Sequence, residues 1–277
     1  MPEYATEVDP LSLQILEAVT DAAYHANVSW VITGAMARRL VFEGIHGQAP
    51  GRRTHDWDLG VQVADWSQLA ALEARLVADA GFESDPRQRQ RMRAPGGGVI
   101  DLIPFGGVEG ERHVVDWGDD GGFELNVAGF RQAFEHACRV RLNDRVTVRV
   151  VPPAGLAMLK LIAWRDRHQE HDRDAEDLAF LLSRYPRLIA DEVHERHAGI
   201  MADEDYDLDC AGARVLGREA AELAGPSLRT SLAAWLSDEL AVAEESRLVV
   251  TTARYLAGRG DGQALALLQA FERGWRA

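Results

Sequence analysis

With 277 residues, the chain is long enough for one large domain or two ordinary ones, and its 47% hydrophobic content is typical of a globular protein. A net charge of -14 disfavours a broad nucleic-acid-binding surface, because displacing counterions from a polyanion needs many basic side chains. No apolar run approaches the ~20 residues of a membrane span, the acidic start is unlike a signal peptide, and two cysteines cannot form a disulfide scaffold. We therefore expect a cytoplasmic protein without membrane contact.

The first part of the chain mixes helices and strands. Apolar residues at helical spacing predict helices, and β-branched runs or strict alternation predict strands. Glycine and proline clusters mark the loops between them. The elements expected in order are a helix over 10–26, a strand over 28–33, a helix over 35–42, a loop over 44–53, a strand over 55–63, a helix over 65–80, a hairpin with arms 87–93 and 99–105, a turn-rich stretch over 112–128 and a strand over 146–150.

Pro152 and Pro153 mark a boundary, and nearly everything beyond them is predicted to be helical. The helices expected there cover 154–167, 173–184, 186–197, 211–224, 227–244, 247–257 and 262–275. The predicted fold class is α+β, with a mixed sheet and flanking helices over 1–151 and a helical C-terminal domain over 152–277. Apolar stripes on the last helices suit either a core or an oligomer contact, so the sequence leaves the oligomeric state open.

Three aspartates on two predicted strands are candidate metal ligands. Asp56 and Asp58 are two residues apart on one strand, so their side chains point to the same side about 6.6 Å apart. Such a pair can hold one divalent metal ion or bridge two, although a short motif of this kind also recurs by chance as solvated acids. Asp101 lies in the apolar run VIDLIPF, where a carboxylate must bind a metal or pair with a cation such as a hairpin arginine.

Gly34 separates a predicted strand from a predicted helix. The start of a helix presents unpaired N–H groups and a partial positive charge, which suit an anion such as a triphosphate. An ordinary helix start, with the glycine easing the turn, is the alternative.

Together these segments resemble the polymerase-beta-type nucleotidyltransferase superfamily. The resemblance rests on a strand ending in Gly34-Ala35, a helix, the Asp56-Trp57-Asp58 motif and a later strand with Asp101. The AbiEii-type abortive-infection subgroup is similar in the runs DLIPFGG at 101–107, LKLIAWRDR at 159–167 and RDAEDLAFLL at 173–182. A glycosyltransferase with an Asp-x-Asp motif is disfavoured, because only one predicted strand precedes Asp56.

The resemblance implies metal-dependent transfer of a nucleoside monophosphate from an NTP to an acceptor, which could be tRNA, a protein or a small molecule. Mg²⁺ or Mn²⁺ would bind Asp56, Asp58 and Asp101, and Asp101 would also assist the attacking hydroxyl. The implied nucleotide-binding residues in this part of the chain are Thr33, Gly34, Ala35, Arg38 and Arg53. A role in toxicity or phage defence, with an antitoxin as a possible partner, is also implied.

One departure from the family pattern favours an alternative function. The family usually has a serine or threonine after the glycine of the turn, where this chain has Ala35. The alternative is a catalytically inactive protein of the same fold that binds nucleotides or a protein partner.

Lys160 is the only lysine of the chain and interrupts an otherwise apolar predicted helix. A buried lysine needs an anionic partner, and the resemblance implies that nucleotide phosphates supply it. A side chain that reaches past its neighbours to solvent is the alternative. Asp174 and Asp177 open the next predicted helix, where Asp174 suits an N-cap and Asp177 favours the helix dipole. The resemblance adds both as secondary nucleotide-binding candidates.

Four arginines alternate along the first hairpin arm, which places them on one face of the predicted strand. They could bind a triphosphate or an RNA backbone, or simply protect a charged edge strand from aggregation. Arg91 and Arg93 are the preferred candidates for phosphate binding among Arg87, Arg89, Arg91 and Arg93.

Overall fold

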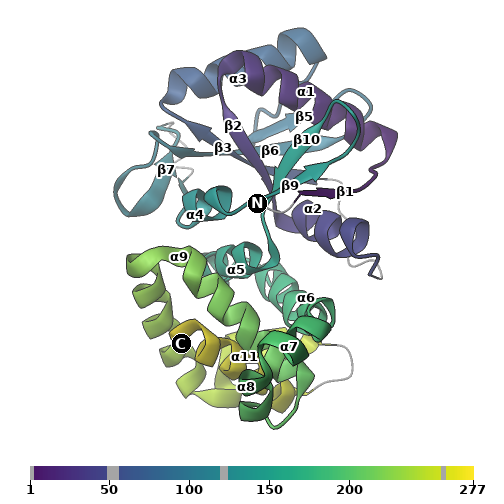
Figure 1. Ribbon diagram of the computed structural model, residues 1–277. Helices are drawn as coiled ribbons and strands as arrows, with labels where there is room; N and C mark the ends of the chain where they lie inside the picture. The colour runs from purple at the N-terminus through teal and green to yellow at the C-terminus, as the bar shows by residue number, and fades with distance from the viewer. Residues whose placement is uncertain (1–2, 49–55, 119–123, 257–259) are drawn as a thin grey trace. The chain divides into compact units, whose positions relative to one another are not determined.

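The computed structural model describes residues 3–48, 56–118, 124–256 and 260–277. The chain divides into two compact units, residues 1–152 and 153–277 (Figure 1). This division falls one residue from the boundary expected at the proline pair. Whether each unit is an independently folding domain stays a prediction.

The first unit is built around an eight-stranded mixed sheet with the strand order β1-β9-β10-β2-β3-β6-β5-β4. At its centre β2 runs antiparallel to β3, whereas β3 and β6 are parallel. A separate two-stranded sheet joins β7 to β8. The strands are β1 (Glu3–Ala5), β2 (Ser29–Thr33), β3 (Asp56–Val63), β4 (Glu83–Ser84), β5 (Arg91–Arg93), β6 (Val99–Gly106), β7 (Val114–Asp116), β8 (Glu124–Asn126), β9 (Cys138–Arg141) and β10 (Thr147–Val150).

Two helices of the first unit begin at side-chain caps. Asp9 accepts a hydrogen bond from the backbone N–H of Ser12 at the start of α1 (Pro10–Ala26), where proline takes the first position. Asp65 caps α3 (Trp66–Ala80) in the same way. The two helices pack against each other on one side of the sheet, and α2 (Gly34–Arg39) and α4 (Phe130–Glu135) lie on the other side (Figure 1).

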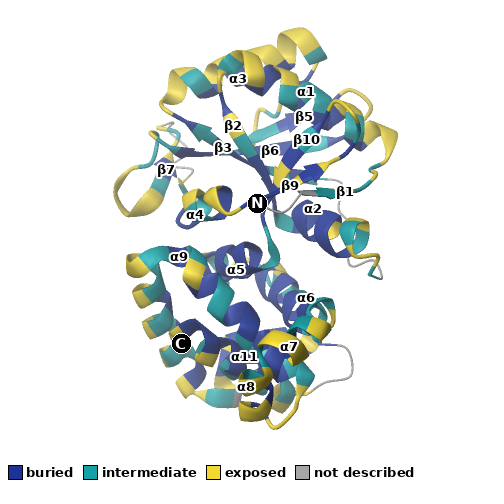
Figure 2. Ribbon diagram, viewed as in Figure 1, coloured by how far each residue is buried: buried dark blue, intermediate teal, exposed yellow. Residues whose placement is uncertain are grey.

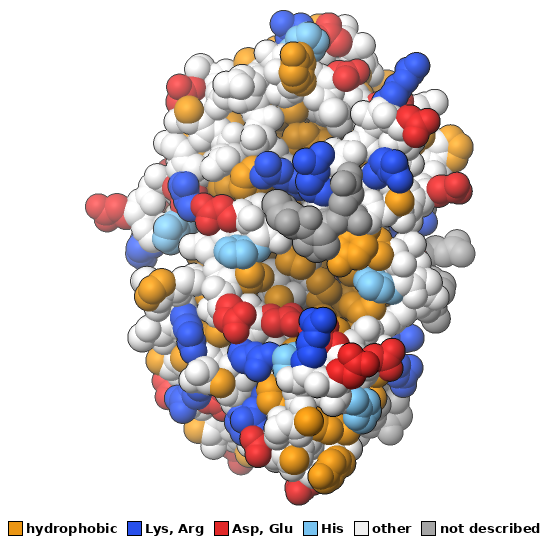
Figure 3. Space-filling view, viewed as in Figure 1, with side chains coloured by type: hydrophobic (Ala, Val, Ile, Leu, Met, Phe, Trp, Pro, Cys, Tyr) orange, Lys and Arg blue, Asp and Glu red, His pale blue; other side chains and the backbone are white. Residues whose placement is uncertain are grey.

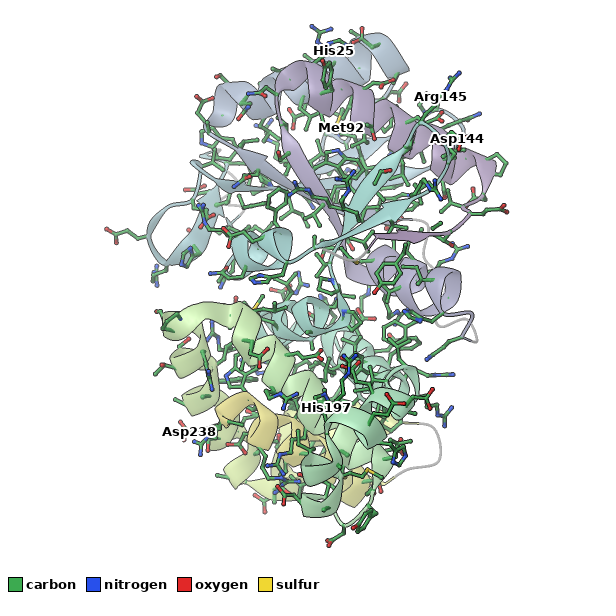
Figure 4. All side chains as sticks on the ribbon, in the orientation of Figure 1. His25, Met92, Asp144, Arg145, His197 and Asp238 are labelled. Atoms are coloured by element: carbon green, nitrogen blue, oxygen red, sulfur yellow. The ribbon has the colours of Figure 1, made fainter. Side chains whose placement is uncertain are left out.

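Alternation along the strands explains the two faces of this sheet. Trp57, Leu59 and Val61 of β3 are almost completely buried, whereas Asp56 and Asp58 point to the opposite face. On β5 the same alternation buries Met92, labelled in Figure 4, between two arginines that share the face of the aspartates. One face of the sheet therefore buries apolar side chains. The other face has charged side chains where β2 ends and β3 begins.

In the described part of the second unit, every secondary-structure element is a helix. Buried positions of its helices face one another around a core that includes Trp164, Phe271 and Trp275 (Figure 2). Close packing of α9 on α11 requires small residues, since a Cβ on Gly274 would lie 2.9 Å from the backbone nitrogen of Arg218. The α-helices are α5 (Pro153–Arg167), α6 (Arg173–Leu188), α7 (Ala190–Arg196), α8 (Ala198–Asp203), α9 (Leu208–Ala241), α10 (Arg247–Tyr255) and α11 (Asp261–Arg276).

The predicted α+β class, with a mixed sheet followed by helices, is confirmed. Several boundaries differ from the predicted ones. The helix expected over 35–42 is the short α2 followed directly by a π-helical segment, Leu40–Ile45. The helices expected over 211–224 and 227–244 form one element, α9, which is kinked where Gly225 takes a φ of 71° before Pro226.

Surface charge is mixed rather than segregated on the face shown in Figure 3, where basic and acidic side chains are interspersed over each unit. Among the described residues, no helix combines the length and the apolar character that a membrane span requires.

Candidate active site

Four neighbouring strands of the first unit bring polar residues into one row across the sheet. Residues that are direct partners on adjacent strands point to the same face. In the row, Thr33 of β2 pairs with Asp58 of β3, Asp58 pairs with Asp101 of β6, and Asp101 pairs with Arg91 of β5. Two residues before Asp58, Asp56 shares this face. The register therefore gathers three aspartates, predicted from far-apart sequence segments, on one face.

Arg91 holds the most buried of these acids. Its Nε and Nη2 atoms donate to Oδ1 and Oδ2 of Asp101 at 2.8 and 2.7 Å, which is a bidentate pair. The same Nη2 atom lies 3.5 Å from Oδ2 of Asp56. Hydrogen bonding to Asp101 raises the pKa of Arg91 against the opposing effect of burial, and the charges of all three aspartates add to the rise. The Arg91 guanidinium thus contacts carboxylates from two strands, β3 and β6.

Exposure differs sharply among these acids. The side chain of Asp101 is 11% exposed, whereas that of Asp56 is 46% exposed. Asp58 is half-buried. A buried carboxylate is stable only with a counter-charge or hydrogen bonds, and Arg91 supplies both. The sequence alternative of an ion pair between Asp101 and a hairpin arginine is therefore present in the structure.

Gly34 lies directly against Asp58. A Cβ built on Gly34 would lie 2.9 Å from Cγ of Asp58 and closer still to its Oδ2 atom. The residue also has a φ of 63°, in the left-handed region that glycine adopts without strain. The glycine at this strand–helix junction therefore leaves room for the carboxylate of the neighbouring strand.

The other nucleotide-binding candidates of this unit have different surroundings. Thr33 and Ala35, on either side of Gly34, are buried, and the Thr33 side chain makes no capping hydrogen bond to α2. Arg38 is buried in the same helix. The predicted site residue Arg53 lies outside the described residues.

The prediction that four hairpin arginines share one strand is wrong. The strand β5 begins at Arg91, and Arg87 and Arg89 lie in two turns that precede it. Arg93 does lie on β5, but its Nη2 donates to Asp85 at 2.8 Å. Arg91 contacts Asp56 and Asp101 of the candidate site.

The second unit contains a separate buried charge cluster around Lys160. Its Nζ lies 2.9 Å from Oδ1 of Asp174 and 2.7 Å from Oδ2 of Asp177. Arg167 adds two hydrogen bonds to Asp174 at 3.0 and 3.2 Å. Burial alone would lower the pKa of Lys160, but the two carboxylates raise it above its ordinary value. The cluster joins α5 to α6 through paired charges.

Two structural interpretations made for this cluster from the sequence are corrected. Asp174 is not the N-cap of α6, because Asp172 takes that position and Asp174 lies in the first turn with its carboxylate turned to Lys160. Lys160 does not reach past its neighbours to solvent, since two aspartates of this chain surround its ammonium group. The lysine needed an anionic partner, as expected, and the next helix supplies one.

The sequence also matches a known protein family over most of its length. Residues 16–245 match the family model described as nucleotidyl transferase AbiEii toxin, type IV TA system. The chain belongs to the AbiEii nucleotidyltransferase family. The matched range covers Asp56, Asp58 and Asp101 as well as the Lys160 cluster. The family indicated by the sequence motifs is therefore confirmed.

Two solved structures illustrate what this AbiEii-family chain is similar to. One is a crystal structure of ANT(2")-Ia in complex with adenylyl-2"-tobramycin, at 13% identity and a TM-score of 0.40, covering 70% of this chain and 98% of that chain. The other is the Thermotoga maritima CCA-adding enzyme complexed with tRNA, at 12% identity and a TM-score of 0.27, covering 98% of this chain and 82% of that chain. No curated protein matches the sequence.

The AbiEii resemblance implies a divalent metal ion. Asp56, Asp58 and Asp101, which we call the acidic face, fit such an ion in charge and atom type. Carboxylate oxygens are the ligands that Mg²⁺ and Mn²⁺ prefer. Oδ2 of Asp56 and Oδ2 of Asp101 already approach one cationic nitrogen of Arg91. Within the described ranges, however, no group of three or more acidic, histidine or cysteine side chains is gathered closely enough to hold a metal. The predicted three-aspartate ligand set is thus on one face but not closed around a common point.

Proposed function

We propose that this protein is a metal-dependent nucleotidyltransferase that transfers a nucleoside monophosphate from an NTP to an acceptor. Membership of the AbiEii nucleotidyltransferase family supports the reaction class. One observation supports placing the reaction at the acidic face: Asp58 pairs with Asp101 across β3 and β6, and Asp56 lies on the same face. These are the acids that the family resemblance assigned to the chemistry.

In the proposed reaction, a hydroxyl oxygen of the acceptor attacks the α-phosphorus of the NTP in line with the bond to the β-phosphate. The new O–P bond forms as the α–β bond breaks, and pyrophosphate leaves with the electron pair of that bond. The hydroxyl proton passes to a carboxylate, a role we assign to Asp101. Mg²⁺ or Mn²⁺, when bound, would neutralise phosphate charge and stabilise the leaving pyrophosphate.

The protein residues divide this work by their positions. Asp56, Asp58 and Asp101 would hold the metal ion, and Asp56 and Asp58 are the more exposed of the three. Gly34 would keep the space beside Asp58 open, because any larger residue would displace that carboxylate. The backbone at Thr33, Gly34 and Ala35 would face the triphosphate. Arg38 and Arg53 would contribute positive charge to the same ligand.

Lys160, Asp174 and Asp177 remain proposed nucleotide-binding residues of the second unit. Their mutual ion pairs give them a structural function as well, since they tie α5 to α6. Lys160 would therefore act on a phosphate only as part of a cluster whose charge is already partly balanced. The stability of a Lys160→Met variant separates the two functions.

A transfer assay with four labelled nucleotides tests the proposed function. The protein is incubated with Mg²⁺ and each α-labelled NTP, together with total RNA, protein extract or a small-molecule fraction. We expect label from at least one NTP to appear in one acceptor fraction, and Asp56→Ala to abolish it. Wild-type protein that labels no fraction with any NTP, in Mg²⁺ or Mn²⁺, would overturn the proposal.

One observation favours an inactive protein of the same fold as the second candidate. The turn has Ala35 where the family usually has a hydroxyl side chain, so a phosphate contact is missing. Such a protein would bind a nucleotide or a protein partner without turnover. Thermal stabilisation by an NTP with Mg²⁺, in the absence of any labelled product, would identify this case.

The family name also suggests a biological setting. An AbiEii toxin would be neutralised by an antitoxin, so we propose a partner protein that suppresses the activity of this chain. Co-expression with the product of a neighbouring gene tests this: growth arrest by the chain alone and rescue by the neighbour would support it. Normal growth on overexpression of the active chain would contradict the toxin function.

A further inference from the structure

The most unusual contact of the acidic face is the one that Arg91 makes with two strands at once. Its guanidinium is bound bidentately by Asp101 on β6, and its Nη2 also lies 3.5 Å from Asp56 on β3. The β5–β6 register makes Arg91 the direct partner of Asp101. The backbone itself therefore fixes this cation against the acids.

The acidic face needs a counter-charge of this kind. Asp58 and Asp101 are direct cross-strand partners, and like charges in that position destabilise a sheet. Asp101 is in addition nearly buried, where an unpaired carboxylate is unfavourable. Arg91 is itself only 22% exposed, so solvent screens this attraction weakly.

Arg93, the other arginine of β5, does not share this position. Arg93 is on the same strand and the same face, two residues further along, yet its guanidinium pairs with Asp85 at 2.8 Å. Arg93 is also more exposed, at 57%. The two arginines thus form a matched pair, one bound to the candidate site and one bound outside it.

We propose that Arg91 is a built-in counter-cation of the acidic face, and that its guanidinium and a divalent metal ion are alternative counter-charges for Asp56 and Asp101. Arg91 is then a positioning residue that keeps these carboxylates together while no metal is bound. This inference rests on the proposed metal-binding function of the same acids. The inference explains why the carboxylate oxygens of Asp56 and Asp101 approach the Arg91 guanidinium. It also explains why no three carboxylates of the described residues are gathered closely enough to hold a metal.

Manganese binding without nucleotide tests this inference with a readout other than activity. Mn²⁺ is titrated into the full chain and binding is followed by electron paramagnetic resonance, with the melting temperature measured in parallel. Arg91→Gln removes one positive charge from the acids, so we expect it to bind Mn²⁺ about tenfold more tightly than the wild type. Its melting temperature should fall without metal and rise more steeply with Mn²⁺.

Arg93→Gln is the control, and it should bind Mn²⁺ with wild-type affinity because its partner is Asp85. Arg91→Lys keeps the charge and should also stay near the wild-type affinity. Arg91→Gln that is folded and binds Mn²⁺ no more tightly than the wild type would overturn the inference. An Arg91→Gln protein that remains unfolded even in saturating Mn²⁺ would overturn it too, because metal should replace the lost charge.

The failure of this inference can be told apart from failure of the proposed function. If the wild type binds Mn²⁺ and transfers nucleotides but Arg91→Gln shows no gain in affinity, the metal function stands and only the exchange of counter-charges is wrong. If neither protein binds Mn²⁺, the metal-binding assignment fails and the inference fails with it.

Discussion

Gly34 and Asp58 are in contact at the point where β2 ends and α2 begins. The glycine has a φ of 63°, and a Cβ at this position would lie 2.9 Å from Cγ of Asp58. The absence of a side chain on residue 34 therefore determines where the carboxylate of the Asp-x-Asp motif can lie. This contact links the glycine turn and the aspartates, which the sequence presents as separate motifs.

Gly34→Ala should lower both stability and transfer activity. A non-glycine residue with this φ costs about 1–2 kcal/mol by itself, and the Cβ must additionally displace the Asp58 side chain. Gly47→Ala is the matched control, because Gly47 has a φ of 61° but no atom within 4 Å of its added Cβ. Denaturant unfolding should show the larger loss for Gly34→Ala. Equal losses with full activity in both variants would show that the contact with Asp58 has no effect.

Lys160→Met should destabilise the second unit strongly. The substitution leaves Asp174 and Asp177 buried with one fewer cation, and removing one partner of a buried ion pair costs about 3–5 kcal/mol. Arg75→Met breaks an exposed pair with Asp79 and should cost no more than about 0.5 kcal/mol. Urea denaturation of both variants measures the difference. A Lys160→Met protein with wild-type stability and lost nucleotide binding would instead favour a function of Lys160 in binding alone.

Glu219 should make the protein less stable as the pH rises above about 4.5. Burial raises the pKa of Glu219 above its ordinary value of 4.5, and a hydrogen bond from Tyr185 opposes that rise. The charges of Glu192 and Glu222 raise the pKa further, and that of Arg218 lowers it. Because the folded state holds this proton more tightly, the stability it contributes is complete below pH 4.5 and is lost as the pH rises through the folded pKa.

Glu219→Gln tests this dependence, since glutamine is uncharged and still accepts a hydrogen bond from Tyr185. Relative to the wild type, the variant should gain stability from pH 4.5 towards neutrality, by about 1.4 kcal/mol for each unit by which the pKa is raised. Glu195→Gln, at an exposed position of α7, is the control. Melting temperatures recorded across this pH range measure the effect. Parallel profiles for the wild type and Glu219→Gln would show that Glu219 does not titrate in this window.

The Asp-x-Asp strand was predictable because alternation is a local property. Trp57, Leu59 and Val61 define the buried face, and that assignment places Asp56 and Asp58 opposite without any knowledge of neighbouring strands. The partner of Asp101 was not predictable to the residue. A hairpin register shift of one residue moves every side chain to the other face, so the sequence offered several arginines and the structure selects Arg91.

Other features depended on packing that the local sequence does not determine. The helix after Lys160 was expected, but its rotation, which turns Asp174 and Asp177 towards the lysine, is set by contacts between α5 and α6. The short strand β9 was missed, although Cys138–Arg141 alternates between buried and exposed positions. Four residues are too few to separate alternation from chance.

The rate of nucleotide transfer by Asp58→Asn tests the central claim most directly. Asp79→Asn is the control, because Asp79 is exposed and pairs with Arg75 on α3. With the NTP and acceptor that the wild type uses, release of pyrophosphate should be about a hundredfold slower or more in Asp58→Asn and unchanged in Asp79→Asn. Transfer by a folded Asp58→Asn protein at the wild-type rate would contradict the assignment of the acidic face as the active site.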